Sequence, residues 1–415
     1  MLSVKELGIN AKKASRVLLT SGTLKNKALK NIADALVKNA QAIIEANNID
    51  IENGRANGLS DAMIDRLRLD ENRINDIAFG INEIIAMPDP VGKVLSGNTL
   101  DNGLKIEKVT VPLGVIGIIF ESRPNVTADA AALCLKAGNC VILRGGKEAI
   151  NSNKAIVSVM RNAIADAGLP QDCINLVEDT TRQSSIELME LSDYLDVLIP
   201  RGGAGLIKAV VNNAKVPVIE TGVGNCHAYI DESADIVMAS NIIFNAKTSR
   251  VSVCNALETM LVHENIADKA LPAIYDKLSQ KNVQIRGCDK TVAILKDKAT
   301  KACDDDYATE FLDYILAVRV VSSIDEAIDH IAKYSSGHSE TIITENYENA
   351  EKFLNSIDSA AVYVNASTRF TDGGQFGLGA EIGISTQKLH ARGPMGLENL
   401  VSTKFVVRGQ GQIRV

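Results

Sequence analysis

Residues 113–149 read LGVIGIIFESRPNVTADAAALCLKAGNCVILRGGKEA. The opening LGVIGIIF is an apolar run typical of a buried strand, Asn125 to Ala137 has the apolar spacing of a helix, and CVILR is a second apolar strand. An apolar strand, a helix and another apolar strand in succession predict two parallel strands joined by a crossover. The segment therefore predicts an α/β fold built on a parallel sheet.

The same alternation continues along the chain. INLVED, a helix from Arg182 to Leu191 and the strand DVLIP extend the pattern to residue 225. Residues 226 to 365 repeat it with different contents, among them the helix DIVMASNIIFNAK and the strands ETMLVH and ILAVRVV. We therefore predict a doubly wound parallel-sheet domain followed by a second α/β domain. For the first of these sheets, in residues 113–225, ligands are expected at the carboxyl ends of the strands.

The two ends of the chain have other patterns. Residues 4 to 86 have helical spacing, with Asn47-Asn48 as a predicted stop and Ser60 as a predicted cap. Asp101-Asn102-Gly103 separates two strand-like runs and is a strong hairpin signal. The last segment, LVSTKFVVRGQGQIRV, is a further alternating strand.

We expect the hairpin and this last strand to form a small β element that pairs across subunits at a sheet edge. The alternative is that both belong to the main sheet. A Gly-rich stretch, FTDGGQFGLGAEIGIS, follows the second domain. The predicted organisation is a cofactor-binding domain with N-terminal helices (1–93 and 113–225), an oligomerisation element (94–112 and 398–415), a catalytic domain (226–365) and a Gly-rich return segment (366–397).

The bulk composition excludes several classes of protein. The chain has 415 residues, 46% of them hydrophobic and 23% charged, with a net charge of −7. This balance gives no footprint for nucleic acid or an anionic membrane, and no apolar run is long enough to span a bilayer. The N-terminus lacks the apolar core of a signal peptide, so we expect a cytoplasmic protein.

The cysteines are odd in number and scattered, without CxxC pairs. That distribution favours reduced thiols over a disulfide framework or a zinc site, and no metal is predicted. The seven cysteines are Cys134, Cys140, Cys173, Cys226, Cys254, Cys288 and Cys303.

Cys254, in SRVSVCNALETMLVH, is the candidate nucleophile. Its neighbours are small or polar, and Arg250 precedes it by four residues. A nearby cation or a helix N-terminus lowers the pKa of a thiol and populates the thiolate. The alternative is a buried cysteine that acts as a small hydrophobic residue, which is the commoner role.

Asn125, in ESRPNV, is the candidate oxyanion donor, because a side-chain amide at a strand end can donate to developing negative charge. Its alternative role is a helix cap. Glu220 and Thr221 end a predicted strand, VPVIE, where a carboxylate can act as general base or simply be exposed. His227 and His390 are weaker catalytic candidates.

Two Gly-rich turns follow predicted strands. In LRGGKEA, Gly145 lets the backbone approach a ligand, and Arg144 and Lys147 supply positive charge suited to an adenosine 2′-phosphate. The second turn, in IPRGGAGLIKAV, opens a helix whose N-terminus can hold a phosphate. Both turns are also compatible with plain strand-to-helix connections. The glycines of the second turn are Gly202, Gly203 and Gly205.

Together these segments resemble the aldehyde dehydrogenase superfamily and, within it, the branch that reduces γ-glutamyl phosphate in proline biosynthesis. The resemblance covers nearly the whole chain and is carried by PLGVIGIIFESRPN, IPRGGAGLI, IETGVGNCH, VCNALET and ARGPMGLENL. It implies an aldehyde dehydrogenase-like fold. It also implies that Cys254 is the nucleophile and Asn125 the oxyanion donor.

The resemblance further places Arg144, Lys147 and the second Gly turn at an NADP(H) cofactor. Glu310, in TEFLDYI, matches the residue that holds the nicotinamide ribose. Glu220 matches the base that activates water in hydrolytic members of the superfamily. Because a reductase needs no hydrolysis, the duty of Glu220 stays open.

The implied reaction is NADPH-dependent reduction of L-glutamyl 5-phosphate to glutamate 5-semialdehyde through a thioester on Cys254. Glutamate 5-kinase is the expected partner that supplies the substrate, and a homodimer or homotetramer is expected. The alternatives are another aldehyde or acyl dehydrogenase on this scaffold, or a non-catalytic protein that keeps the fold. Candidate clamps for the anionic substrate, each alternatively a structural arginine, are Arg123, Arg250, Arg369 and Arg392.

Overall fold

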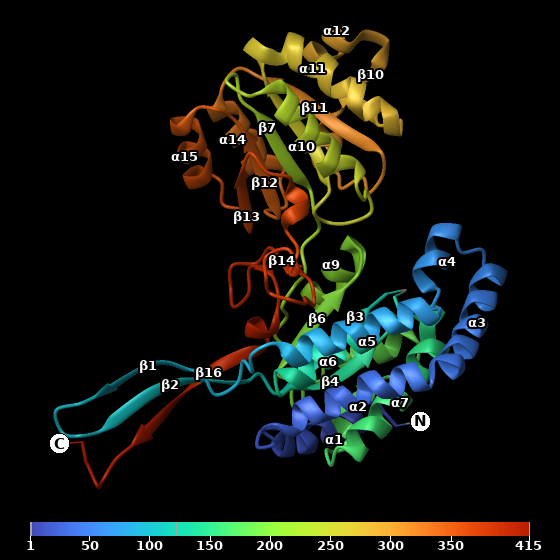
Figure 1. Ribbon diagram of the computed structural model, residues 1–415, viewed down its shortest axis with the longest axis vertical. Helices are drawn as coiled ribbons and strands as arrows, with labels where there is room; N and C mark the ends of the chain where they lie inside the picture. Colours follow the sequence, from blue (N-terminus) through green and yellow to red (C-terminus); the bar gives the residue numbers. More distant parts are fainter. Residues whose placement is uncertain (1, 122, 415) are drawn as a thin grey trace. The chain divides into compact units, whose positions relative to one another are not determined.

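The computed structural model describes residues 2–121 and 123–414 and divides into two compact units (Figure 1). Unit 1 consists of Met1–Glu220, Leu378–Gly383 and Met395–Val415, and unit 2 of Thr221–Gly377 and Ile384–Pro394. The Gly-rich return segment is thus shared between the units. No helix in the described part of the chain combines the length and the apolar character that a membrane span requires.

Unit 1 is built on a four-stranded parallel sheet with the strand order β5-β4-β3-β6. All six residues of β3 are buried, as expected for a strand covered on both faces. The strands are β3 (Val115–Phe120), β4 (Cys140–Arg144), β5 (Ile174–Leu176) and β6 (Val197–Arg201). The connecting helices are α6 (Asn125–Lys136), α7 (Ile150–Asp166), α8 (Arg182–Met189) and α9 (Ala204–Asn213).

The N-terminal helices pack on this layer, with α1 against β4 and α2 against α7. They are α1 (Val4–Leu18), α2 (Leu24–Lys38), α3 (Ala40–Ala56), α4 (Asp61–Leu67) and α5 (Glu71–Ala86). The predicted cap is confirmed, because the Ser60 hydroxyl accepts from Met63 N at the start of α4. The predicted stop at Asn47-Asn48 is wrong: α3 runs through both residues, because Asn47 is buried and bonds to Leu67, Leu69 and Ser152.

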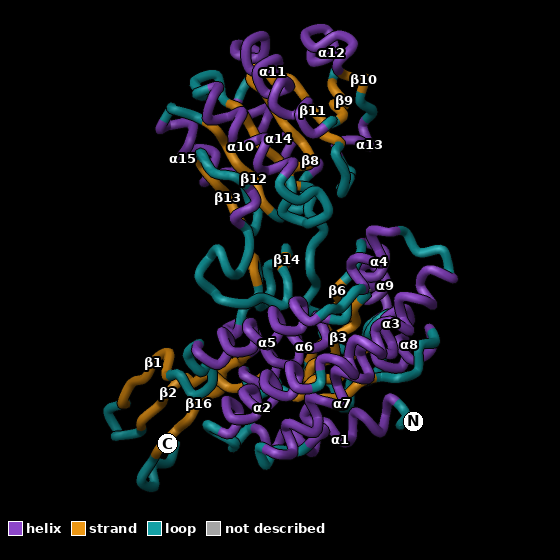
Figure 2. The backbone as a smooth tube through the Cα atoms, turned by 45° about the vertical axis from the view of Figure 1, so that its right-hand side comes forward, coloured by secondary structure: helices purple, strands orange, loops and turns teal. Residues whose placement is uncertain are grey.

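A separate three-stranded antiparallel sheet has the order β1-β2-β16, and Figures 1 and 2 show its strands side by side. The strands are β1 (Val94–Thr99), β2 (Lys105–Pro112) and β16 (Val401–Arg408). The predicted hairpin is confirmed, with Gly103 at a φ of 85° in its turn. The alternative that these strands join the main sheet is wrong, and the last strand finds its neighbour, β2, within its own chain.

The predicted strand VPVIE is also wrong. This stretch makes only an isolated parallel bridge, between Leu198 and Val218. Leu198 N donates to Pro217 O at 2.8 Å and Ile219 N donates to Leu198 O at 3.0 Å. Pro217 has no N–H to offer a ladder, so the segment runs extended beside β6 without becoming a regular strand.

Unit 2 contains a seven-stranded parallel sheet with the order β10-β9-β11-β8-β7-β12-β13. Its strands are β7 (Cys226–Ile230), β8 (Leu257–His263), β9 (Gln284–Gly287), β10 (Ala299–Lys301), β11 (Ile315–Val321), β12 (Ser339–Ile343) and β13 (Ala361–Val364). Its helices are α10 (Ile236–Thr248), α11 (Glu264–Leu278), α12 (Asp289–Leu295), α13 (Asp304–Tyr307), α14 (Ile324–Tyr334) and α15 (Tyr347–Ser356). A two-stranded sheet of β14 (Ile384–Ser385) and β15 (Gly393–Pro394) completes the unit.

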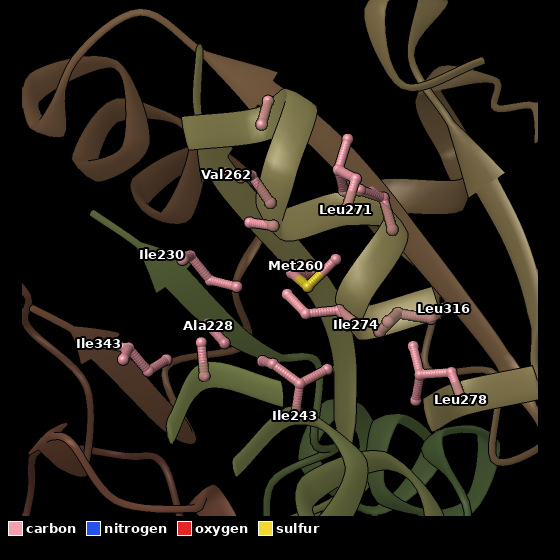
Figure 3. Close-up of a cluster of buried hydrophobic side chains, with 14 of the residues drawn as sticks. Ala228, Ile230, Ile243, Met260, Val262, Leu271, Ile274, Leu278, Leu316 and Ile343 are labelled. Carbon is pink, nitrogen blue, oxygen red and sulfur yellow. The ribbon is translucent and has the colours of Figure 1, made fainter. Parts of the chain in front are cut away.

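Alternate residues of the central strands serve opposite faces of this sheet. Ala228 and Ile230 of β7 and Met260 of β8 join a cluster with α10 and α11, in which Ile243 and Ile274 point toward them (Figure 3). The intervening Tyr229 and Leu261 pack on the other face, against α14 and α15. Because both faces are covered, every residue of β7, β8 and β12 is buried, including their few polar side chains, which confirms the predicted second α/β layer.

Candidate active site

Cys254 lies in unit 2, on the turn of residues 249–256 that joins α10 to β8. Its side chain is half-buried. The thiol is not at a helix N-terminus, so of the two activating features considered from the sequence only nearby cations remain. The turn closes through Ala256 N, which donates to Val253 O at 3.1 Å.

The segment that follows β13 holds this turn at Asn255, the residue after Cys254. Asn255 is buried, and its Nδ2 donates to Thr371 O at 2.9 Å while its carbonyl accepts from Thr368 Oγ1 at 2.8 Å. These bonds fasten the residue after Cys254 to the segment that follows β13. The backbone beside the thiol is therefore fixed by polar contacts that the sequence neighbours alone do not provide.

The backbone of Gly224 lies directly against Cys254. A Cβ at Gly224 would stand 1.5 Å from Cys254 O, so only glycine fits there. Cys226 Sγ donates to the same carbonyl at 3.2 Å, and Gly224 N donates to Glu310 Oε1 at 2.7 Å. Burial raises the pKa of Glu310, and the Gly224 N–H opposes that shift.

These groups gather at the amino ends of three adjacent strands. Cys254 precedes β8, Gly224 precedes β7 and Glu310 precedes β11, and the sheet order is β11-β8-β7. The expectation that ligands meet the carboxyl ends of the strands was made for the sheet of residues 113–225, so it does not extend to this group of residues in unit 2.

Two of the predicted arginines lie near the thiol. Arg369 is half-buried, its Nε donates to Ser249 Oγ at 3.0 Å, and it interacts electrostatically with Cys254 and Arg250. Burial lowers the pKa of Arg369, and the charge of Arg250 lowers it further. Arg392 instead pairs with Asp358, with Nη1 and Oδ1 2.8 Å apart.

Asn125 lies in unit 1 as the first residue of α6, where the predicted helix was expected to begin. Its Nδ2 donates to Asp129 Oδ2 at 3.0 Å, one helical turn later. Burial raises the pKa of Asp129 to about 6, and the bond from Asn125 opposes the shift. Arg123, two residues before Asn125, is exposed.

Both Gly-rich turns follow strands that flank β3, so they share the carboxyl edge of the unit 1 sheet. In the first turn a Cβ at Gly145 would stand 2.2 Å from Asn153 Nδ2, which explains the glycine. Arg144 donates to Gly145 O at 3.0 Å and to Thr180 O at 3.0 Å. Lys147 is exposed. Of the two cations, Lys147 is thus the one presented to solvent.

In the second turn, Gly203 is the N-cap residue of α9, and its N–H donates to Glu121 Oε2 at 3.0 Å. A Cβ at Gly202 would stand 2.6 Å from the same oxygen, whereas Gly205 has open space around it. A carboxylate thus already occupies an N–H of this helix N-terminus, which is evidence that the turn accepts an anion. The sequence interpretation missed Glu121.

The remaining candidates have different environments. Glu220 is half-buried in unit 1, and His390 is exposed in unit 2. His227 is buried, its Nδ1 lies 3.0 Å from Asn225 O, and burial lowers its pKa to about 4. Among residues 2–121 and 123–414, no three His, Cys, Asp or Glu side chains are grouped so as to hold a metal ion.

Comparison with known proteins extends these observations. A family model described as the aldehyde dehydrogenase family matches residues 4–301. A gamma-glutamyl phosphate reductase from Clostridium novyi is 58% identical over 405 residues, which are 97% of each chain. One from Halothermothrix orenii is 59% identical with the same coverage. The chain belongs to the gamma-glutamyl phosphate reductase family.

Solved structures agree with this assignment. The crystal structure of gamma-glutamyl phosphate reductase from Thermotoga maritima covers 100% of both chains at 51% identity, with a TM-score of 0.98. An acetylating aldehyde dehydrogenase from Geobacillus thermoglucosidasius shares the fold at 19% identity, with a TM-score of 0.70 over 99% of this chain and 97% of its own. As a member of the gamma-glutamyl phosphate reductase family, the chain is an oxidoreductase with an aldehyde dehydrogenase fold, and the family implies a nicotinamide cofactor.

Some residues of the site were not predicted. Gly224, Cys226 and Glu121 contact candidate residues only through the fold, whereas Asp129 lies one helical turn after Asn125, a spacing that the sequence shows. Two glycines close together in IETGVGNCH were the signal for Gly224, since paired glycines outside a regular turn often mark a close backbone approach. Cys226 and Glu121 carry no pattern that separates them from ordinary core or surface positions.

Proposed function

We propose that the chain catalyses the NADPH-dependent reduction of L-glutamyl 5-phosphate to L-glutamate 5-semialdehyde, with release of phosphate, through a thioester on Cys254. The observation that carries the proposal is the half-buried Cys254 thiol on a turn fixed by Asn255 and Gly224, with Arg369 nearby. Membership of the gamma-glutamyl phosphate reductase family supports this substrate.

In the first half of the reaction, the Cys254 thiolate attacks the γ-carbonyl carbon of the acyl phosphate. A carbon–sulfur bond forms and the carbonyl electron pair moves onto oxygen. We assign Asn125 Nδ2 and the Cys254 N–H as donors to this oxyanion. When the carbonyl re-forms, the bond to phosphate breaks and a thioester remains. No acid is needed, since phosphate is already a good leaving group.

NADPH, when bound, supplies hydride to the acyl carbon at the thioester stage. The remaining task of the protein is to hold the sulfur in place and then to release it. Cys254 leaves as a thiolate when the carbonyl re-forms, which frees the semialdehyde and regenerates the enzyme. A covalent acyl group thus gives a positioned reactant in place of a diffusing one.

We assign the anionic groups of the substrate to Arg250 and Arg369, because Arg369 interacts electrostatically with both Cys254 and Arg250. The same charges stabilise the thiolate. Arg392 already pairs with Asp358 and is a weaker candidate, and Arg123 is kept as a candidate without an assigned group. The role of Glu220 in this reaction is not assigned, since the reaction contains no activated water.

We assign NADP(H) to the shared carboxyl edge of the unit 1 sheet. Its residues fit such a cofactor, because Lys147 is an exposed cation and the Gly202–Gly205 turn already accepts a carboxylate at an N–H. Lys147 would take the 2′-phosphate, and Arg144 would shape the turn through its bonds to backbone carbonyls. In this assignment the cofactor displaces the Glu121 carboxylate from its hydrogen bond with the Gly203 N–H.

We propose that the β1-β2-β16 sheet joins subunits in a homodimer or homotetramer. All residues of β1 are exposed, and the apolar Val94 and Phe405 are 58% and 67% exposed. Exposed apolar residues on an edge strand are typical of a sheet that another chain covers. Sedimentation of the wild type against Phe405→Lys tests this. We also keep a cytoplasmic location and a partner glutamate 5-kinase as proposals.

The reverse reaction tests the proposed function. Purified protein is incubated with glutamate 5-semialdehyde and NADP⁺, with and without phosphate, and NADPH absorbance is followed. The expected result is NADPH formation that requires phosphate and is abolished in Cys254→Ala. Formation without phosphate would instead identify a hydrolytic aldehyde dehydrogenase and restore Glu220 as general base.

A further inference from the structure

Glu310 is bonded to the backbone that supports the nucleophile. Its Oε1 accepts the Gly224 N–H at 2.7 Å, a short bond as expected for a charged acceptor. Gly224 in turn lies in contact with the Cys254 carbonyl, so closely that no side chain fits between them. The carboxylate therefore reaches the nucleophile through a single intervening residue.

The loop that carries Glu310 has a second attachment to the same region. Leu312 N donates to Glu258 Oε1 at 3.2 Å, and Glu258 belongs to β8, the strand that follows the Cys254 turn. Leu312 has a φ of 55°, a conformation that is costly for a leucine and persists only where the surroundings fix it. The Glu310 loop is thus fastened on both sides of the nucleophile turn.

We propose that Glu310 is a positioning residue for Cys254, which holds the thiol in its reactive orientation through the Gly224 N–H. This deepens the proposed function and rests on its assignment of Cys254 as nucleophile. The family resemblance assigns Glu310 to the nicotinamide ribose. The two roles are compatible, because a carboxylate has two oxygens and the Gly224 N–H bonds to Oε1.

Alkylation of Cys254 by iodoacetamide tests the proposal without substrate or cofactor. The second-order rate constant is measured at several pH values by mass spectrometry of the Cys254 peptide, for the wild type, E310Q, E310A and E310D. Glutamine keeps an acceptor at the same reach, alanine removes it, and aspartate keeps the charge but is one methylene too short. E351A, at an exposed glutamate of α15, is the matched control.

The expected result is a loss of about five-fold in rate for E310A and E310D, the size of one hydrogen bond, with E310Q and E351A close to wild type. In E310D, which keeps the negative charge, the midpoint of the pH profile moves upward, because the thiolate is less well placed beside Arg369. Equal rates and midpoints in all variants would overturn the proposal. So would a loss in E310Q as large as in E310A, since the charge and not the bond would then matter.

Thermal unfolding of each variant shows whether the variant is folded, so that a change in alkylation rate is not mistaken for unfolding. If E310A does not fold, the comparison of E310D with E310Q carries the same test. The phosphate-dependent assay is separate, because an enzyme that fails it can still show the alkylation pattern. A wild-type result in that assay with unchanged alkylation in E310A and E310D would reject the positioning role alone.

Discussion

Lys247 Nζ lies 2.6 Å from Glu258 Oε2, and both side chains are completely buried. Lys247 is at the end of α10 and Glu258 is near the start of β8, so the pair closes the turn that carries Cys254. Burial raises the pKa of Glu258 to about 7 and lowers the pKa of Lys247, and the attraction between the two opposes both shifts. The nucleophile turn is thus closed at its base by an ion pair inside the unit 2 core.

Removing one partner of this pair is expected to destabilise unit 2 strongly. Lys247→Met leaves a buried carboxylate unpaired, at a cost of about 3–5 kcal/mol. The double change Lys247→Met with Glu258→Leu should recover much of that loss, because no charge is left unpaired. Calorimetry measures both variants. Lys30→Met, at the exposed Lys30–Asp34 pair, is the control and should leave the unfolding temperature unchanged. A single variant no worse than this control would contradict the structure.

Gly224→Ala is expected to abolish turnover. The added methyl group would overlap the Cys254 carbonyl, and both partners are backbone, so neither can move alone. Gly80→Ala is the matched control, since a Cβ there meets nothing within 4 Å and alanine favours a helix by about 1 kcal/mol. The measurement is reductase activity together with the Cys254 alkylation rate. Normal activity in Gly224→Ala would show that the contact is looser than described.

The bond from Asn125 to Asp129 predicts a pH effect on turnover. Asp129, with its pKa raised to about 6, accepts most strongly from Asn125 when ionised, and the bond weakens as the carboxylate is protonated below about pH 6. Turnover of the wild type should therefore have an acid limb near pH 6 that disappears in Asp129→Asn. Asn125→Ala should lower kcat by about 10²–10³ with a small change in KM. An acid limb that persists unchanged in Asp129→Asn would assign it to another group.

Substitutions of Arg144 and Lys147, the two cations of the first Gly-rich turn, should have different effects on the selectivity for NADPH over NADH. Lys147→Ala is expected to weaken NADPH binding and leave NADH binding unchanged, because only NADPH carries the 2′-phosphate. Arg144→Ala should weaken both, because Arg144 holds the carbonyls of Gly145 and Thr180. Fluorescence titration with each cofactor gives the dissociation constants. Equal losses for both cofactors in Lys147→Ala would reject its assignment to the phosphate.

Buried histidines predict loss of stability in acid. Burial lowers the pKa of His330 to about 3, and neither ring nitrogen has a hydrogen-bond partner among the described residues. An unfolded histidine titrates near 6.5, so the unfolded chain binds more protons between pH 6.5 and pH 3. Stability is therefore full above about pH 6.5 and falls as the pH decreases. His330→Leu should flatten this fall in unfolding temperature between pH 7.5 and 5. An identical slope would exclude His330 as a source.

The local sequence pattern predicted the regular helices and strands. It failed where contacts with residues distant in sequence decided the structure. The apolar run of β3 and the spacing of α6 were predicted within two residues, because burial on both faces leaves a direct signature in composition. Asn47 looked like a helix stop but lies inside α3, because its partners at Leu67 and Ser152 are distant in sequence. Short elements such as β10 and α13 carry too few residues for a period to be read.

What the sequence determined by itself is the α/β class, the hairpin at Gly103 and the identity of Cys254, Asn125 and the two Gly turns as chemically capable groups. These follow from local properties: burial, turn chemistry and the reactivity of particular side chains. What only the tertiary structure decided is which groups meet. Gly224 and Glu310 reach the Cys254 turn because parallel strands of one sheet bring their ends together, and strand order cannot be read from a linear pattern.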